Sequence, residues 1–195
     1  MKNISDKDWQ YLIPVLVCTI CFIATDIVVV VKKIEFSYWS GLLSSQPYRI
    51  ITNHFIHQNT HHLLANISGI VVARYCLNGL SLKGKYFFLI LIMILVPLQT
   101  LLFWFSDLFI FNNTMSIAIG FSGIIYGVDS FILLSSIYGK NKFLWLQPQL
   151  RTNKQIRKIL VSLTVIGCLW SLLPGISLLG HLTGMMAGVI LFLLF

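Results

Sequence analysis

Gly120-Phe121-Ser122-Gly123-Ile124-Ile125-Tyr126 places a serine between two glycines at one end of a hydrophobic segment. A lone serine in an apolar helix commonly bonds back to the carbonyl four residues earlier and has no chemical role. The flanking glycines remove side chains on both sides, so that another backbone can come close. Small residues also recur wherever membrane helices touch, so the serine is a candidate nucleophile only if a base lies at the same depth. The sequence offers His181, in Gly180-His181-Leu182-Thr183-Gly184, as that base.

The composition indicates a membrane protein. Hydrophobic residues make up 57% of the 195 residues and charged residues only 10%, whereas a soluble domain carries about 25% charged residues. The apolar residues fall in runs of roughly 17 to 25, the length at which a helix crosses a bilayer. The net charge is +8, but the basic residues lie in short loops between these runs, as topology signals do. We therefore expect one membrane domain over residues 1–195, surrounded by lipid, and no nucleic-acid partner.

The apolar runs predict an all-α membrane protein, a bundle of six transmembrane helices. The predicted spans are residues 11–31, 61–80, 86–105, 117–138, 159–173 and 176–195. No small-residue cleavage site follows the first run, so we interpret it as a retained anchor rather than a signal peptide. Residues 34–60 are too polar to cross lipid, and their aromatic side chains are suited to the membrane interface.

The basic residues predict the orientation of this bundle. If the N-terminus is inside, eleven lysines and arginines lie in inner segments and only Lys32, Lys33 and Arg49 lie in outer ones. The positive-inside rule then places both termini in the cytoplasm. The second, fourth and sixth spans all begin at the outer face, with Ser122 just over one turn inside the fourth. The rise of a helix puts the polar residues near these three beginnings within about 10 Å of the outer surface.

Polar residues at this common depth predict acyl-transfer chemistry. A serine hydroxyl is a poor nucleophile until a base takes its proton, and neutral imidazole does this near pH 7. His62 and Asn66 lie four residues apart on one helical face, and both can donate hydrogen bonds to an oxyanion. The backbone amide of Ser122 is a further donor. One such residue alone would be expected only to hydrogen-bond two helices together, but four at one depth favour a catalytic site.

The order of these motifs resembles that of the rhomboid intramembrane serine proteases. The resemblance covers the first outer loop and the second, fourth and sixth spans, through Tyr48-Arg49, His57-x4-His62-x3-Asn66, Gly120-x-Ser122-Gly123-x-x-Tyr126 and Gly180-His181-x-x-Gly184-x-x-x-Gly188. It implies that the chain cleaves a peptide bond in or near the transmembrane segment of a membrane-protein substrate. Ser122 would be the nucleophile and His181 the general base of a dyad.

The resemblance also implies roles for the surrounding residues. His62, Asn66 and the Ser122 amide would form the oxyanion site. The supporting residues would be Gly120, Gly123, Tyr126, Gly184 and Arg49. Tyr126 would pack on the imidazole, Gly184 would allow a close helix contact, and Arg49 would hold the membrane-embedded first loop.

Within the family, the chain resembles the rhombosortase branch. We expect no soluble N-terminal domain and no seventh span, and His57-Gln58-Asn59 leads into the second span. Tyr48 stands where many members have tryptophan before the arginine. The branch is associated with bacterial surface proteins that carry a C-terminal Gly-Gly motif, a membrane span and a basic tail. The implied location is the bacterial inner membrane, as a multi-pass protein.

The remaining histidines and the cysteines invite a metal or disulfide interpretation. His54, His57, His61 and His62 lie close together, but no carboxylate or cysteine accompanies them as a zinc site would require. We therefore predict no metal and no cofactor. The cysteines all lie in or beside apolar runs and are expected to be small buried hydrophobic residues: Cys18, Cys21, Cys76 and Cys168.

Asp129 and the overall polarity leave alternatives to be weighed. Asp129 lies seven residues after Ser122 and so about 10 Å deeper, too deep to orient His181 as the acid of a triad. We expect it to bond to a neighbouring helix or to be protonated. The alternative functions are a catalytically inactive relative that binds transmembrane segments and a small transporter. A transporter would usually need a polar path near the midplane, whereas the polar groups here gather at one side.

Overall fold

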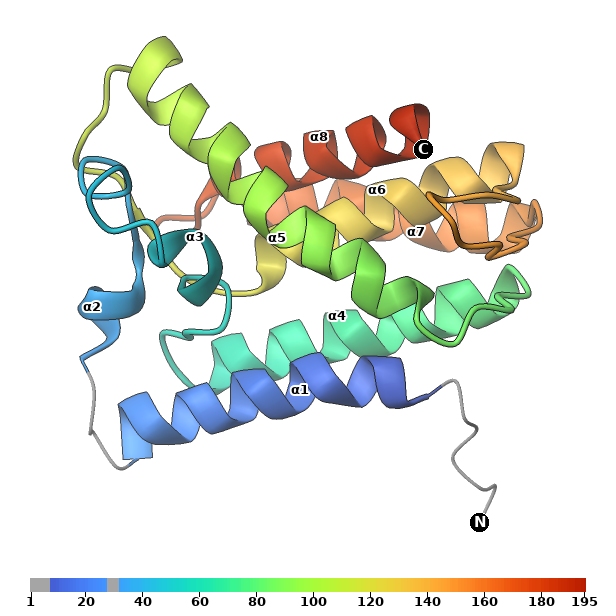
Figure 1. Ribbon diagram of the computed structural model, residues 1–195, viewed down its shortest axis with the longest axis horizontal. Helices are drawn as coiled ribbons and strands as arrows, with labels where there is room; N and C mark the ends of the chain where they lie inside the picture. The colour runs from blue at the N-terminus through green and yellow to red at the C-terminus, as the bar shows by residue number, and fades with distance from the viewer. Residues whose placement is uncertain (1–7, 28–31) are drawn as a thin grey trace.

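Helices make up most of the structure, a computed structural model that describes residues 8–27 and 32–195 (Figure 1). The predominantly helical character predicted from the sequence is confirmed. Lys2 and Lys7, which the topology prediction used, and the predicted end of the first span at residues 28–31 lie outside the described residues. The long helices are α1 (Trp9–Phe22), continued by the π-helical η1 (Ile23–Ile27), α4 (Thr60–Gly79), α5 (Phe87–Phe105), continued by η2 (Ser106–Ile110), α6 (Ser122–Tyr138), α7 (Lys154–Trp170) and α8 (Leu178–Leu194). The short elements are α2 (Lys33–Phe36), β1 (Tyr38–Trp39), α3 (Arg49–Thr52) and β2 (Ile117–Ala118).

The long helices alternate in direction, as the loops between them require. In Figure 1, α4, α6 and α8 all begin at the left end of the bundle, and α1, α5 and α7 run the other way. Two segments of the described chain, Trp9–Ile27 and Phe87–Ile110, are helices long and apolar enough to cross a membrane. Helices α6 and α8 are apolar but shorter.

The predicted beginning of the fourth span, at residue 117, is wrong. Residues 117 and 118 do not begin a helix but form β2, which pairs antiparallel with β1 so that Tyr38 faces Ala118. Gly120 then adopts a φ of +113°, a left-handed conformation that favours glycine. Ser122 is therefore the first residue of α6 rather than a residue one turn inside it. Hydropathy does not reveal this, because residues 117–121 are as apolar as the helix that follows.

Two other helix ends also differ from the predicted spans. Helix α5 continues through η2 to Ile110, and Asp107, expected in a loop, is buried there and accepts a hydrogen bond from the Tyr38 hydroxyl (2.7 Å). Helix α7 begins at Lys154, before the predicted residue 159, because the Asn153 side chain caps the amides of Gln155 and Ile156. Local hydrogen bonds, not hydropathy, set these boundaries.

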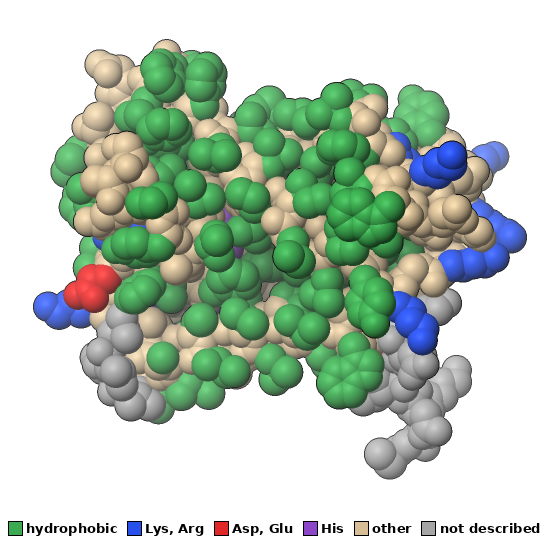
Figure 2. Space-filling model, in the orientation of Figure 1, with side chains coloured by type: hydrophobic (Ala, Val, Ile, Leu, Met, Phe, Trp, Pro, Cys, Tyr) green, Lys and Arg blue, Asp and Glu red, His purple; other side chains and the backbone are tan. Residues whose placement is uncertain are grey.

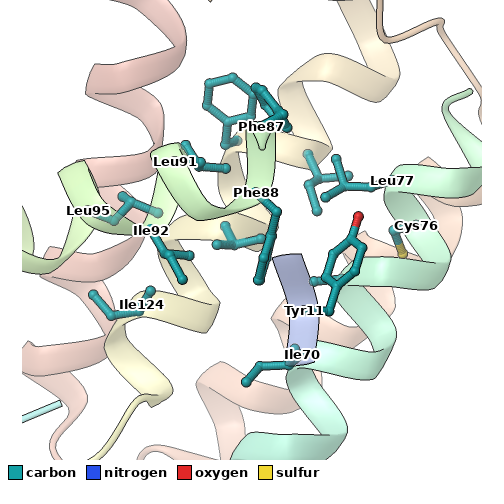
Figure 3. Packing of buried hydrophobic residues seen from close by; sticks show 14 of the residues in the cluster. Tyr11, Ile70, Cys76, Leu77, Phe87, Phe88, Leu91, Ile92, Leu95 and Ile124 are labelled. Carbon is teal, nitrogen blue, oxygen red and sulfur yellow. The ribbon is translucent and has the colours of Figure 1, made fainter. Parts of the chain in front are cut away.

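The hydrophobic core lies where α1, α4, α5 and α6 meet. Figure 3 shows Tyr11 of α1 beside Phe88 of α5, with the two ring centroids 4.6 Å apart. Ile70, from α4, and Ile124, from α6, extend the same cluster. Cys18 and Cys76 are buried, as expected, whereas Cys21 and Cys168 are only partly buried; all four are free thiols.

The closest helix contact joins α6 to α8 through glycines on both sides. A Cβ atom at Gly184 would overlap the backbone of Gly123, and one at Gly188 would overlap the backbone of Gly127. In the other direction, a Cβ at Gly127 would lie 2.9 Å from the carbonyl oxygen of Gly184. Each helix thus presents two glycines four residues apart, the pattern that lets membrane helices approach backbone to backbone.

The Gly188→Leu variant is expected to destabilise the bundle, because the new side chain meets backbone that cannot rotate away. Overpacking typically costs about 1–3 kcal/mol, so the melting temperature in detergent should fall by roughly 3–10 °C. Val189→Leu, on the exposed side of the same helix, is the matched control and should melt like the wild type. Equal melting temperatures for Gly188→Leu and the control would contradict the close packing.

Candidate active site

Ser122 and His181 meet where α6 and α8 begin. The Ser122 Oγ lies 2.8 Å from the His181 Nε2, within hydrogen-bond distance. Ser122 opens α6, and His181 lies in the first turn of α8, which the Ser177 hydroxyl caps by accepting from the Gly180 amide. The two residues singled out from the sequence therefore lie together, although they are 59 residues apart in the chain.

The His181 ring is held on its face by Tyr126. The two ring centroids are 4.3 Å apart and the planes differ by 21°, a stacked arrangement. Tyr126 is in turn packed against α7, because a Cβ at Gly167 would overlap the tyrosine hydroxyl. The position of the imidazole thus depends on α6 and α7 as well as on α8.

The second ring nitrogen of His181 bonds to a residue that was not predicted. The His181 Nδ1 lies 2.6 Å from the Oγ of Ser171, which follows α7 and is 2% exposed. A serine ten residues before a candidate base is a weak sequence signal, and the sequence interpretation passed over it. Asp129, considered and set aside as the third residue, has a buried Oδ1 with no hydrogen-bond partner among the described residues. Of the two alternatives expected for Asp129, a bond to a neighbouring helix or protonation, the first is not found at Oδ1.

His62 and Asn66 lie beside the turn that leads into Ser122. A Cβ at Gly120 would stand 2.6 Å from the His62 Nε2 and 3.5 Å from the Asn66 Nδ2. The Asn66 Nδ2 is buried and has no hydrogen-bond partner among the described residues. The His62 Nδ1 accepts a long bond from the Gln58 amide (3.4 Å), which leaves the His62 Nε2 to carry the ring proton. Two N–H donors are thus available beside Gly120, two residues before Ser122.

These side chains line one cavity of about 1100 Å³. It reaches from Lys33 and the first loop, past the pair Ser122 and His181, to Trp170 at the end of α7. In Figure 2, histidine atoms are visible between the hydrophobic side chains of one face. The volume is at the upper end of ordinary ligand pockets and has room for a stretch of extended peptide.

A comparison with protein-family models matches residues 44–195 to the Rhomboid domain. The chain belongs to the rhomboid family. Rhomboids are intramembrane serine proteases that act on membrane proteins within the bilayer, and this chain is accordingly an integral membrane protein. None of the curated proteins compared with the chain matches it. The resemblance seen in the sequence is confirmed at the level of the family.

In this rhomboid, the buried Arg49 organises the first loop. Its guanidinium donates to the carbonyl oxygens of Ile34 (2.7 Å) and Ser37 (2.5 Å) and to the Gln46 side chain (2.6 Å). The loop then reaches the site through Asn53, whose carbonyl oxygen accepts a hydrogen bond from the Gly120 amide at 2.9 Å. Together with the β1–β2 pair, this bond fixes residues 117–120, the segment that precedes Ser122.

Gln99 is a second residue near the site that sequence reasoning missed. Its Nε2 donates to the Gly180 carbonyl oxygen (3.0 Å) and the Thr183 hydroxyl (3.2 Å), and so ties α5 to the first turn of α8. The signal was present, since an amide side chain in a highly apolar span is costly unless it has a partner. Gln99 thus holds residues on either side of His181.

The histidines of the first loop are hydrogen-bonded within the protein. The His54 Nε2 lies 3.0 Å from the Val96 carbonyl oxygen and 2.8 Å from the Thr100 hydroxyl. The His57 Nδ1 lies 3.2 Å from the Phe55 carbonyl oxygen, and its ring packs edge-on against His62. Among residues 8–27 and 32–195, no three His, Cys, Asp or Glu side chains are placed to hold a metal ion.

Acid is expected to destabilise this loop through its buried histidines. Burial lowers the pKa of His54 to about 4, and burial, followed by the nearby His62, lowers the pKa of His57 to about 4. Because an unfolded histidine takes up its proton near pH 6.5, stability should fall as the pH drops from 6.5 towards 4. His54 alone should account for about 2–3 kcal/mol of this loss.

Melting temperatures in detergent between pH 7.5 and 4.5 measure the effect. His54→Asn should show a flatter decline than the wild type. His61→Gln, which replaces an exposed histidine nearby, is the control and should keep the wild-type decline. A slope unchanged in His54→Asn would contradict the assignment.

Proposed function

We propose that this rhomboid is an active serine endopeptidase that cleaves a peptide bond in or near the transmembrane segment of a membrane protein. The observation that carries the proposal is the 2.8 Å contact between the Ser122 Oγ and the His181 Nε2. A serine and a histidine in this geometry are a nucleophile and its base. The contact lies in a cavity that also holds the unpaired amide nitrogen of Asn66.

The reaction follows from this geometry. As the Ser122 Oγ attacks the scissile carbonyl carbon, His181 takes the hydroxyl proton at Nε2 and later gives it to the departing amine. The negative charge that forms on the carbonyl oxygen is stabilised by the Asn66 Nδ2, the His62 Nε2 and the Ser122 amide. Water then attacks the acyl ester, with His181 again as the base. Gly120, Gly123, Tyr126, Gly184 and Arg49 support this site through the contacts described above.

The proposed topology is a single domain of six spans, α1 and α4 to α8, with both termini in the cytoplasm of a bacterium and the protein in its inner membrane. Lysines and arginines gather at the end of the bundle where α4 and α6 end, opposite Ser122 (Figure 2), which agrees with the positive-inside rule. Helix α6, with 17 residues, is about 25 Å long and is preceded by non-helical backbone beside the cavity. Such backbone is tolerated at membrane depth where it lines water, and water is what the acyl enzyme needs.

The substrate must expose a carbonyl that an intact helix would hide in its hydrogen bonds. We propose that it enters the bundle laterally and unwinds at small, helix-breaking residues near the outer face. A C-terminal Gly-Gly motif followed by a membrane span would meet this need, in keeping with the resemblance to the rhombosortase branch. Genes for such Gly-Gly-tailed proteins in the same genome would favour that branch over a general rhomboid.

The Ser122→Ala variant should abolish both proteolysis of a fluorescent transmembrane peptide and labelling by a fluorophosphonate, since it removes the only proposed nucleophile. Loss of at least 10³-fold in kcat is expected. Ser130→Ala is the matched control, because the Ser130 hydroxyl lies on the same helix and donates back to the Tyr126 carbonyl oxygen. The control should cleave the peptide and be labelled by the fluorophosphonate like the wild type.

The other outcomes separate the alternative functions. Cleavage that survives in Ser122→Ala would contradict the serine mechanism and favour a metal site at the histidines of the first loop. Labelling of neither protein, together with saturable binding of transmembrane peptides, would identify an inactive relative. Movement of a solute across proteoliposomes would favour the transporter.

A further inference from the structure

The Ser171 Oγ contacts three polar groups: the Gly167 carbonyl oxygen, the His181 Nδ1 and, at the longer distance of 3.5 Å, the Tyr126 hydroxyl, which can donate to it. The Ser171 Oγ lies 2.6 Å from the carbonyl oxygen of Gly167 and 2.6 Å from the Nδ1 of His181. Ser171 is almost fully buried, so water does not compete for either contact. Its backbone amide also donates to the Gly167 oxygen, at 2.9 Å, which holds the residue at the end of α7.

A hydroxyl has one proton, and the Gly167 carbonyl can only accept. If the proton pointed to His181 instead, two oxygen lone pairs would face each other at 2.6 Å. The Ser171 proton is therefore placed on the carbonyl, and its oxygen lone pair faces the imidazole. The His181 Nδ1 must then carry a hydrogen, and the Nε2 is left without one, as an acceptor for the Ser122 hydroxyl.

We propose that Ser171 is a positioning residue that holds His181 in the Nδ1–H tautomer and aims its Nε2 at Ser122. The proposal rests on the proposed function, and it adds Ser171 as a third member to the pair Ser122 and His181. The chain of hydrogen bonds runs from Ser122 through His181 and Ser171 to the Gly167 carbonyl. It differs from an acid-based triad in that its last member is a neutral hydroxyl anchored on a helix end.

Helix α7 strengthens this arrangement when His181 becomes charged. In the reaction, the Ser122 proton moves to the Nε2 and the imidazolium keeps its Nδ1 hydrogen on the Ser171 oxygen. The Gly167 carbonyl lies in the last turn of α7, at the negative end of the helix dipole. Polarised by that carbonyl, the Ser171 oxygen is a better acceptor for the charged ring. The same proton returns to the leaving amine, so no group is consumed.

The competing interpretation is that Ser171 only closes the end of α7. Serine hydroxyls commonly bond back to the carbonyl four residues earlier, and Ser135 does so on Phe131 at 2.9 Å without touching the site. The contact with His181 is what separates the two roles. A cap would matter for stability but not for the state of the imidazole.

The decisive measurement is the tautomer of His181 in protein labelled with ¹⁵N-histidine in detergent micelles, where imidazole nitrogen shifts distinguish Nδ1–H from Nε2–H. The His181→Gln variant identifies the signal. The wild type should be in the Nδ1–H form, Ser171→Ala should show the Nε2–H form, and Ser171→Thr should retain the wild-type form. Ser135→Ala, a buried serine with the same back-bond, is the matched control and should leave the signal unchanged.

Kinetics with a fluorescent transmembrane peptide provide a second readout. Ser171→Ala should lower kcat by about 10- to 100-fold, the worth of one hydrogen bond to a charged group, with little change in KM. Ser171→Thr should restore most of the loss, and Ser135→Ala should retain wild-type kcat.

Two results would overturn the proposal: a wild-type His181 without a hydrogen on Nδ1, or a Ser171→Ala protein whose tautomer does not change. The tautomer is measured without any turnover, so it decides the role of Ser171 even if the wild type cleaves nothing. A wild type that cleaves nothing would contradict the proposed function and leave the role of Ser171 to be decided by the tautomer.

Discussion

The close contact between α6 and α8 is the constraint on which the rest of the structure depends. Glycines on both helices remove every side chain that would separate the two backbones. Only at this separation does a serine at the beginning of one helix reach a histidine in the first turn of the other. Membrane helices gain little from hydrophobic exclusion of one another, so packing of this kind provides much of their attraction. The stability of the bundle and the proposed chemistry therefore depend on the same pair of helices.

The other elements position the groups around Ser122 and His181, which the α6–α8 contact brings together. The first loop, held by Arg49, fixes the segment before Ser122 through Asn53 and a short strand pair. Helix α4 brings His62 and Asn66 beside the same segment, and α7 supplies the hydroxyl on the far side of the imidazole. Each group comes from a different part of the chain, which explains why the site lies at one end of the bundle, where these segments meet.

The family and the pairing of Ser122 with His181 were predictable from the sequence, because the motifs lie near the beginnings of helices. Hydropathy locates the beginnings of α4 and α8 to within two residues, but it places that of α6 five residues too early. What was missed depends on three-dimensional details that periodicity does not encode. The start of α6 is decided by a strand pair between segments far apart in the chain. Ser171 and Gln99 are single polar residues whose importance depends on a partner in another helix, and a sequence without that partner's position cannot rank them.

The central claim is that Ser122 is made reactive by His181 across the α6–α8 contact. Its most direct test is peptide mapping by mass spectrometry after treatment with a fluorophosphonate, for the wild type and for His181→Asn in the same detergent. We predict a single phosphonylated residue, Ser122, in the wild type and no adduct in His181→Asn. An adduct on another residue, or modification of Ser122 at the wild-type rate in His181→Asn, would contradict the account.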